Sequence, residues 1–227
     1  MAMSVLLRGR LADAAGSVHD FGDWLRVLGS WVSLFHCGVA NRLLVGHATG
    51  WSAACVLPLR KWNALGVRVK PGEHGIPVYS PHRGEYGRGV YFSAGYVFDA
   101  SQTSLGPVPA YRPKSLGLSR GFLAGCAHRA VLGHPDASCP APLGVIEEGA
   151  AFLLCLLAGA GEPDMPYTRL WVPSAGAEAI GAALRAIGTA SKAAVGGLRG
   201  QGIGIEPPRC WERAKAFVEA KARQKDC

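Results

Sequence analysis

The sequence predicts an α+β protein, in which an N-terminal helix packs on a small, mainly antiparallel sheet and a mostly helical C-terminal region follows. Apolar residues recur at steps of three and four between residues 20 and 45, which is the spacing of an amphipathic helix. Short apolar runs between residues 67 and 98 are separated by glycine- and proline-rich turns, as in paired strands. Residues 208–227 combine mixed charges with a narrow apolar stripe, which predicts a further helix.

Composition divides the 227 residues into three parts. We expect a first domain over residues 1–103, a linker rich in proline, glycine and serine over 104–121, and a helical region over 122–227. Apolar residues make up 49% of the chain, which is enough for a packed core. The net charge of +8 favours a polyanionic partner and argues against a protein that mimics DNA, because such a protein would be acidic.

The cysteine pattern and the apolar runs indicate the cell compartment. Seven cysteines are scattered without a CxxC pair, which predicts reduced thiols and no disulfide framework. The longest apolar run, residues 149–161, is shorter than the ~20 residues of a membrane-spanning helix. We therefore expect a cytoplasmic protein that does not associate with a membrane.

The predicted helix over residues 20–45 presents one apolar stripe, which we interpret as core. Ser17 or Asp20 can cap its start. Asn41 is the exception, because an amide beside an apolar stripe needs hydrogen-bond partners. Two roles stay open for Asn41: it ties the helix to the following loop, or it contacts a nucleotide.

Residues 60–88 form a strongly basic stretch, in which six cations stand against Glu73 and Glu85 and leave a net charge of +4. The cations are Arg60, Lys61, Arg68, Lys70, Arg83 and Arg88. The aromatic residues in and after this stretch are Trp62, Tyr79, Tyr91, Tyr96 and Phe98. Cations along a phosphate backbone, with aromatic faces on which bases stack, are typical of single-strand binding. The alternative is a solvated basic sheet face with the aromatic residues buried beneath it.

Three residues of this stretch carry separate expectations. Arg68 and Lys70 are two apart in a predicted strand over residues 67–70 and would therefore share one face. The ring of Trp62 is either a stacking platform for a base or part of the core. We favour the core, because Leu65 lies three residues on and can share a buried helical face with it.

The polar residues near the turns are ambiguous in the same way. Gln102 and Thr103 suit hydrogen bonds to bases or sugars, although capping the following segment is an equal alternative. Glu73 would repel phosphate, so we expect it to hold its own glycine turn or to pair with Arg68.

Three spaced motifs carry a resemblance to a known family. They are N-x-L-L at residues 41–44, W-x-x-L-G-x-x-V-x-x-G-E-x-G-I-x-V at residues 62–78 and V-F-D-x-S-Q-T at residues 97–103. Together they resemble the N-terminal single-stranded-DNA-binding domain of ArdC-type antirestriction proteins. One departure is Leu59, where the family usually carries an aromatic residue.

This resemblance implies non-catalytic binding of single-stranded DNA, in an antirestriction or mobile-element role. Together with the charge pattern, it suggests that the DNA-binding residues are Asn41, Arg60, Lys61, Trp62, Arg68, Lys70, Tyr91, Gln102 and Thr103.

The second half of the chain resembles the zinc metallopeptidase domain of the same family. That domain carries HExxH on a helix, where the glutamate activates the zinc-bound water. His134 resembles the histidine near the end of that helix, and the stretch that begins at Glu148 resembles the later ligand helix. Counting back from His134 places Cys126, Ala127 and Ala130 where the HExxH residues would stand. Alanine offers no lone pair to a metal and no proton to transfer, so the resemblance implies a degenerate region that is not an enzyme and holds no metal or other cofactor.

The alternative is a metal-dependent peptidase with a non-standard metal site. Its candidate ligands are Cys126, His128, His134, Cys139 and Glu148. Cys126 and His128 are two apart and would face different ways on a helix, and the spacing of known zinc ligands is not met. We expect the helical C-terminal region to offer a surface to a protein partner instead.

Overall fold

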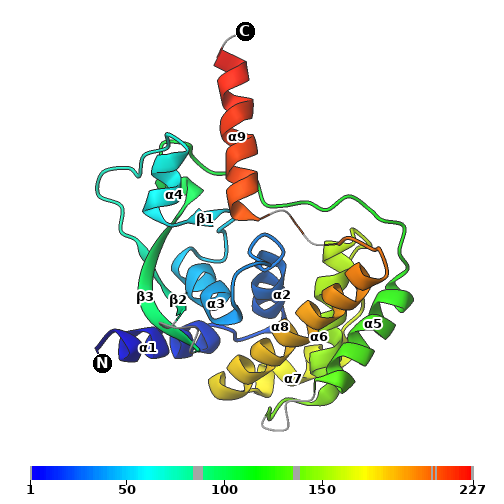
Figure 1. Ribbon diagram of the computed structural model, residues 1–227. Coiled ribbons are helices and arrows are strands. Elements are labelled where there is room, and N and C mark those ends of the chain that lie inside the picture. The colour runs from blue at the N-terminus through cyan, green and yellow to red at the C-terminus, as the bar shows by residue number, and fades with distance from the viewer. Residues whose placement is uncertain (1, 84–88, 135–138, 206, 208, 226–227) are drawn as a thin grey trace.

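The computed structural model describes residues 2–83, 89–134, 139–205, 207 and 209–225. A small antiparallel sheet lies beside a group of helices, and the C-terminal helix α9 stands out from both (Figure 1). This arrangement is the α+β class that the sequence predicts.

Separate helices replace the single helix predicted for residues 20–45. Their bounds are Phe21–Ser30 for α2 and Val39–Ala48 for α3, and α1, Ala2–Gly16, precedes them. Asp20 caps α2 by accepting a hydrogen bond from the Asp23 backbone N–H at 2.8 Å. The prediction of one continuous helix is wrong because Trp31 and Phe35 are also buried in the turns between α2 and α3. An apolar stripe therefore continues across a break that periodicity alone does not reveal.

The described residues form one three-stranded antiparallel sheet in the order β1-β3-β2. The bounds are Val56–Leu57 for β1, Ile76–Arg83 for β2 and Val90–Asp99 for β3. The apolar runs within residues 90–98 thus form one continuous strand. The predicted strand over residues 67–70 is reduced to an isolated bridge between Val69 and Thr103, because Pro71 and Gly72 turn the chain directly afterwards.

Helix α4, Leu59–Ala64, packs against β3, and the 3-10 helix η2, Ala100–Gln102, follows that strand. Gly66 has a φ of 70°, a left-handed conformation that favours glycine. The chain therefore leaves the short helix at this glycine.

The remaining helices form a bundle beside the sheet. Their bounds are Arg120–Gly133 for α5, Leu143–Leu157 for α6, Pro166–Trp171 for α7, Val172–Ser174 for the 3-10 helix η3 and Ala177–Gly200 for α8. The largest core joins residues of α1 and α2, such as Ala14 and Trp24, to residues of α6 and α8, such as Leu153 and Ile187. This core therefore spans the predicted boundary between residues 103 and 122.

Helix α9, Cys210–Lys225, packs on the rest of the protein through the apolar stripe that the sequence predicts. Ala214 is fully buried, and Trp211, Phe217 and Val218 are partly buried against a second core that contains Trp62. Among the described residues, no helix combines the length and the apolar character that a membrane span requires.

Candidate nucleic-acid interface

Asn41 is held by the backbone of the sheet. Its Nδ2 donates to the Tyr79 carbonyl and its Oδ1 accepts from the Tyr79 N–H, both at 2.8 Å. The amide thus pairs with the outer edge of β2 as a neighbouring strand would. Of the two roles left open, the structure gives Asn41 a structural tie, although to β2 and not to the following loop.

The same edge of β2 is protected by two prolines. The Tyr79 N–H points to Asn41 and hence away from β3, and Pro77 and Pro81 share its position in the alternation of the strand. Proline lacks the N–H that would point outward at these positions. An edge without free donors is a poor template for pairing with another chain.

Arg42, the variable residue of N-x-L-L, is fully buried. Its guanidinium lies 5.1 Å from the ring of Trp31 and 5.0 Å from the ring of Phe35, and it donates to the carbonyls of Phe35 and Cys37. Burial lowers the pKa of Arg42 to about 10 and raises that of the neighbouring Cys37 thiol to about 12. Arg42 is therefore a core cation and not a phosphate contact.

Trp62 is also part of the core. The side chain is 0% exposed, and its indole N–H donates to the Phe98 carbonyl at 3.0 Å. This confirms the expectation that the ring is buried, and it corrects the inclusion of Trp62 among the DNA-binding residues. A ring without an exposed face cannot stack on a base.

The V-F-D-x-S-Q-T motif builds a local clamp. Asp99 caps η2, and it also accepts from the backbone N–H groups of Ala54 and Cys55 at 3.3 Å each. Gln102 completes the capping box by accepting from the Asp99 N–H, and its Nε2 donates to Glu73 at 2.9 Å. Asp99 therefore joins the segment before β1 to the end of β3, while Gln102 joins the 71–75 turn to η2.

Thr103 and Glu73 complete this clamp. Thr103 is 0% exposed and donates to the Ala100 carbonyl at 2.7 Å, so it cannot reach a nucleotide without unfolding. Glu73 is bound by Gln102, which agrees with the expectation that it holds its turn. Thr103 also accepts from the Leu105 N–H, so the capping alternative describes Thr103, whereas Gln102 caps η2 and not the following segment.

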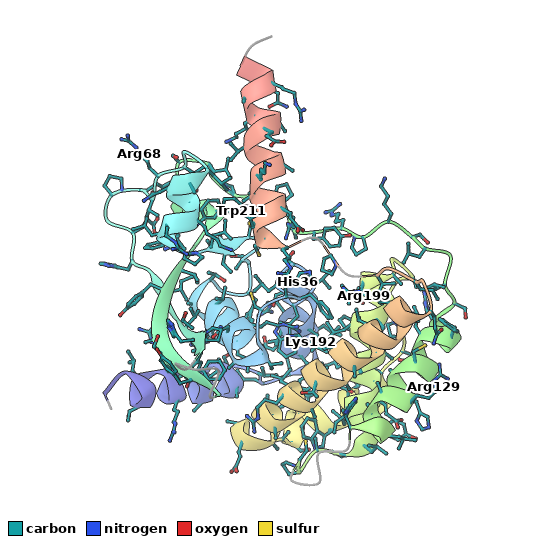
Figure 2. The ribbon with its side chains drawn as sticks, in the orientation of Figure 1. His36, Arg68, Arg129, Lys192, Arg199 and Trp211 are labelled. Carbon is teal, nitrogen blue, oxygen red and sulfur yellow. The ribbon has the colours of Figure 1, made fainter. Side chains whose placement is uncertain are left out.

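The four basic residues that are expected to bind DNA all lie on the surface. Arg60, Lys61, Arg68 and Lys70 are exposed. Lys61 lies 5.7 Å from the ring of Trp211 in α9, and the Lys70 Nζ donates to the Ser101 carbonyl at 2.7 Å. The Arg68 side chain points away from the body on the side of α4 remote from α9 (Figure 2). The side chain of Arg83 and the whole of Arg88 lie outside the described part of the chain.

Large aromatic side chains are exposed on β3. Tyr91, Phe92 and Tyr96 expose 58%, 64% and 51% of their surface. Phe92 and Tyr96 are four apart and thus share a face, and Val97, on the opposite face, packs against the core beneath α3. Tyr91 lies on the inner face beyond that core, where its ring stacks on His82 at 5.2 Å.

The outer face of β2 and β3 thus carries a row of aromatic rings, which consists of Tyr79, Phe92 and Tyr96 and which we call the aromatic row. Tyr79 meets Phe92 edge to face, with ring centroids 6.5 Å apart. Phe92 is not among the residues that the sequence predicts for binding, and Tyr96 is only one of several aromatic residues that follow the basic stretch. Their four-residue spacing within one continuous strand is the signal that could have paired them.

The 71–75 turn places the cations next to this row. At Gly75 an added Cβ would lie only 2.9 Å from the Tyr96 Cβ and 3.1 Å from a ring carbon of Phe98, so the close approach requires glycine. Gly72 has a φ of 83°, which reverses the chain between Lys70 and Gly75. Lys70 therefore lies one short turn away from the aromatic row.

In the bundle, the positions that the resemblance aligns with HExxH lie on a packed face of α5. Cys126, Ala127 and Ala130 are at most 9% exposed and belong to the largest core. Arg129 donates to the Cys126 sulfur at 3.3 Å, beside a hollow of about 210 Å³ between α5 and α8. His134 lines this hollow as well.

The remaining polar residues of this region hold helices together. The two carboxylate oxygens of Glu148 accept from the N–H groups of Tyr167 and Thr168 at 3.0 and 2.7 Å, so they cap the start of α7. His128 and Glu147 pair at 2.8 Å between α5 and α6. In the described part of the chain, no three His, Cys, Asp or Glu side chains are grouped so that they could hold a metal ion. The residues present do not fit a peptidase metal.

Comparison with known proteins gives a likeness in fold. No family model and no curated protein sequence matches the chain. The Mn(II)-bound crystal structure of the antirestriction ArdC protein from plasmid R388 is similar at 17% identity and a TM-score of 0.45, over 73% of this chain and 88% of that one. Its metal-free structure is similar at 19% identity and a TM-score of 0.41, over 70% and 82%.

Proposed function

We propose that the chain binds single-stranded DNA without catalysing a reaction on it, and that bases stack on the aromatic row. The exposure of Phe92 and Tyr96 carries this proposal. Every base has an aromatic face, so such rings bind single strands with little sequence preference, whereas the bases of a duplex are already stacked. Neighbouring exposed rings on a sheet also indicate an interaction surface in their own right.

Cations near the row would bind the phosphates. Lys70 is linked to Tyr96 through the 71–75 turn, and Arg68 extends from the same segment into solvent. Arg60 and Lys61 lie on α4, the helix that packs against β3. Tyr91, on the opposite face of the hairpin, would contact the strand where it passes from one face of the hairpin to the other. Asn41, Gln102 and Thr103 would act indirectly, by fixing the strand edge and the turn on which these residues lie.

The biological setting follows from the motifs. Their resemblance to ArdC-type proteins supports an antirestriction or mobile-element role in the cytoplasm, with the helical region offered to a protein partner. The buried Ala127 and Ala130 support a non-catalytic role for that region, because they supply neither a metal ligand nor a general base.

A binding titration with a labelled oligonucleotide tests the proposal. Phe92→Ala together with Tyr96→Ala should weaken binding to a single strand by at least ~30-fold, because each of the two stacked bases contributes ~1–3 kcal/mol and 1.4 kcal/mol is about tenfold. Tyr167→Ala is the matched control, since Tyr167 is 65% exposed but lies on α7 in the bundle. Its removal should leave the affinity unchanged.

The same titration can overturn the proposal. Wild-type protein that binds duplex as tightly as single-stranded DNA would exclude stacking as the basis of recognition. Equal affinities for the aromatic double variant and the Tyr167→Ala control would place the binding surface elsewhere.

A further inference from the structure

A groove separates the outer half of α9 from the turns that follow α4 and η2. It encloses about 450 Å³, a volume within the range of small-ligand sites, ~300–1,000 Å³. Leu65, Val67 and Leu105 form one wall, and Val218, Lys221 and Ala222 of α9 form the other. The groove therefore combines an apolar floor with a cation.

The base of α9 is anchored, so the groove has a defined shape. Arg213 donates to the Ala54 carbonyl at 2.6 Å and to the Pro109 carbonyl at 2.7 Å. The Cys55 thiol donates to the Cys210 carbonyl at 3.1 Å. Phe217, Val218 and Lys221 also contact the body, but residues 221–224 of α9 are exposed and the helix extends away from the sheet and the bundle (Figure 1). A short helical segment with few tertiary contacts is marginally stable in water. The projection of α9 therefore indicates that the outer half of this helix contacts a further molecule.

The charges on α9 favour an anionic occupant. Glu212 accepts from the Arg209 backbone N–H at 2.9 Å, and Glu219 lies 3.9 Å from Lys215. Lys221 is exposed, and among the described residues its Nζ donates to a neutral carbonyl, that of Leu105. Among the described residues that line the groove there is no carboxylate. The positive charge of Lys221 is therefore available to a phosphate.

We propose that this groove is a second nucleotide subsite, in which a base packs on Leu65, Leu105 and Val218 and the adjoining phosphate pairs with Lys221. The inference rests on the proposed function and assigns α9 to the same interface. Phe98 connects the two sites, because it follows Tyr96 on the same face of β3 and packs in the core beneath the groove. A strand that leaves the aromatic row in this direction would meet the cations of α4 and then the groove.

The test compares Lys221→Gln with Arg223→Gln in the full chain. Residues two apart on a helix are about 200° apart around its axis. Arg223 therefore points away from the groove and is a matched control for the loss of one positive charge. With a 20-nucleotide single strand, Lys221→Gln should weaken binding about 3- to 10-fold at low salt and lower the salt slope by ~0.7, the value for one phosphate contact. Arg223→Gln should change neither quantity.

A short oligonucleotide and a second variant separate this inference from the proposed function. A five-nucleotide strand that covers only the aromatic row should bind wild type and Lys221→Gln equally. Ala222→Phe fills the groove without removing charge and should weaken binding of the long strand alone. Normal binding of the long strand by both variants would refute the subsite while leaving the aromatic row intact, and would favour a protein partner for α9. Failure of the wild-type protein to bind either strand would refute both proposals.

Discussion

The segment from α3 to η2 and the bundle formed by α5 to α8 differ in how they use the positions that the sequence motifs select. In the first region Asn41, Asp99 and Gln102 each pair with backbone groups far along the chain. In the bundle Ala127 and Ala130, at the positions counted back from His134, are core. A polar residue in a motif can thus serve the fold, because buried backbone groups need partners. The three residues of the exposed aromatic row lie outside the motifs, and their exposure is the observation that supports the binding proposal.

The largest expected effect concerns Trp62, whose role in the fold contrasts with that of an exposed ring. Trp62→Ala should lower the free energy of unfolding by ~3–5 kcal/mol, because it leaves a cavity and removes the donor to the Phe98 carbonyl. Urea unfolding measures this, with Phe92→Ala as the exposed control that should cost much less. A Trp62→Ala protein that is as stable as wild type but has lost DNA binding would reverse the assignment.

The bundle offers the converse experiment, which introduces the glutamate that the sequence resemblance leads one to expect at residue 127. Ala127→Glu should destabilise the protein by about 3 kcal/mol, since Ala127 is fully buried and a carboxylate there would lack partners. Thermal unfolding with and without Zn²⁺ checks it. Stabilisation by the metal would show that the region still has the outline of a metal site, contrary to our expectation.

Smaller losses of stability are expected when one hydrogen-bonding side chain is removed from each region. Asn41→Ala should cost ~1–3 kcal/mol, because the change leaves both the N–H and the carbonyl of Tyr79 unpaired at the edge of β2. Glu148→Ala should cost ~1–2 kcal/mol by removing the cap of α7. If Asn41 acts by holding the edge of β2, Asn41→Ala should lose DNA affinity only as far as β2 becomes disordered. The rate of amide hydrogen exchange at Tyr79 measures this disorder. Loss of affinity with unchanged exchange would instead indicate a direct nucleotide contact.

The smallest effect depends on pH. Burial raises the pKa of Cys37 to about 12 from the ordinary 9.0. Its neutral thiol therefore contributes stability that is complete below pH 9 and is lost as the pH rises toward 12. Between pH 8.5 and 10, wild type should lose at most about 1 kcal/mol more than Cys37→Ala in urea unfolding. Equal losses would mean that water reaches the thiol in the folded state.

Local rules in the sequence were sufficient for several elements. Asp20 caps α2 and Gly66 ends the turn after α4, because each of these signals acts on backbone groups within a few residues. The burial of Trp62 followed from its helical spacing to Leu65. The fold class followed from the alternation of helical and extended periodicity.

Only the tertiary structure decided which polar residues were free to bind. Asn41 meets Tyr79 across 38 residues and Gln102 meets Glu73 across 29, and no local pattern encodes such a pairing. The break between α2 and α3 was hidden because both helices and the turns between them contribute to the same core. The sequence by itself determined where the chain carries charge, aromatic rings and helix ends, since these are properties of neighbouring residues. Exposure is a property of the packed molecule, so only the fold could show that Phe92 and Tyr96 face solvent while Trp62, Gln102 and Thr103 hold the scaffold.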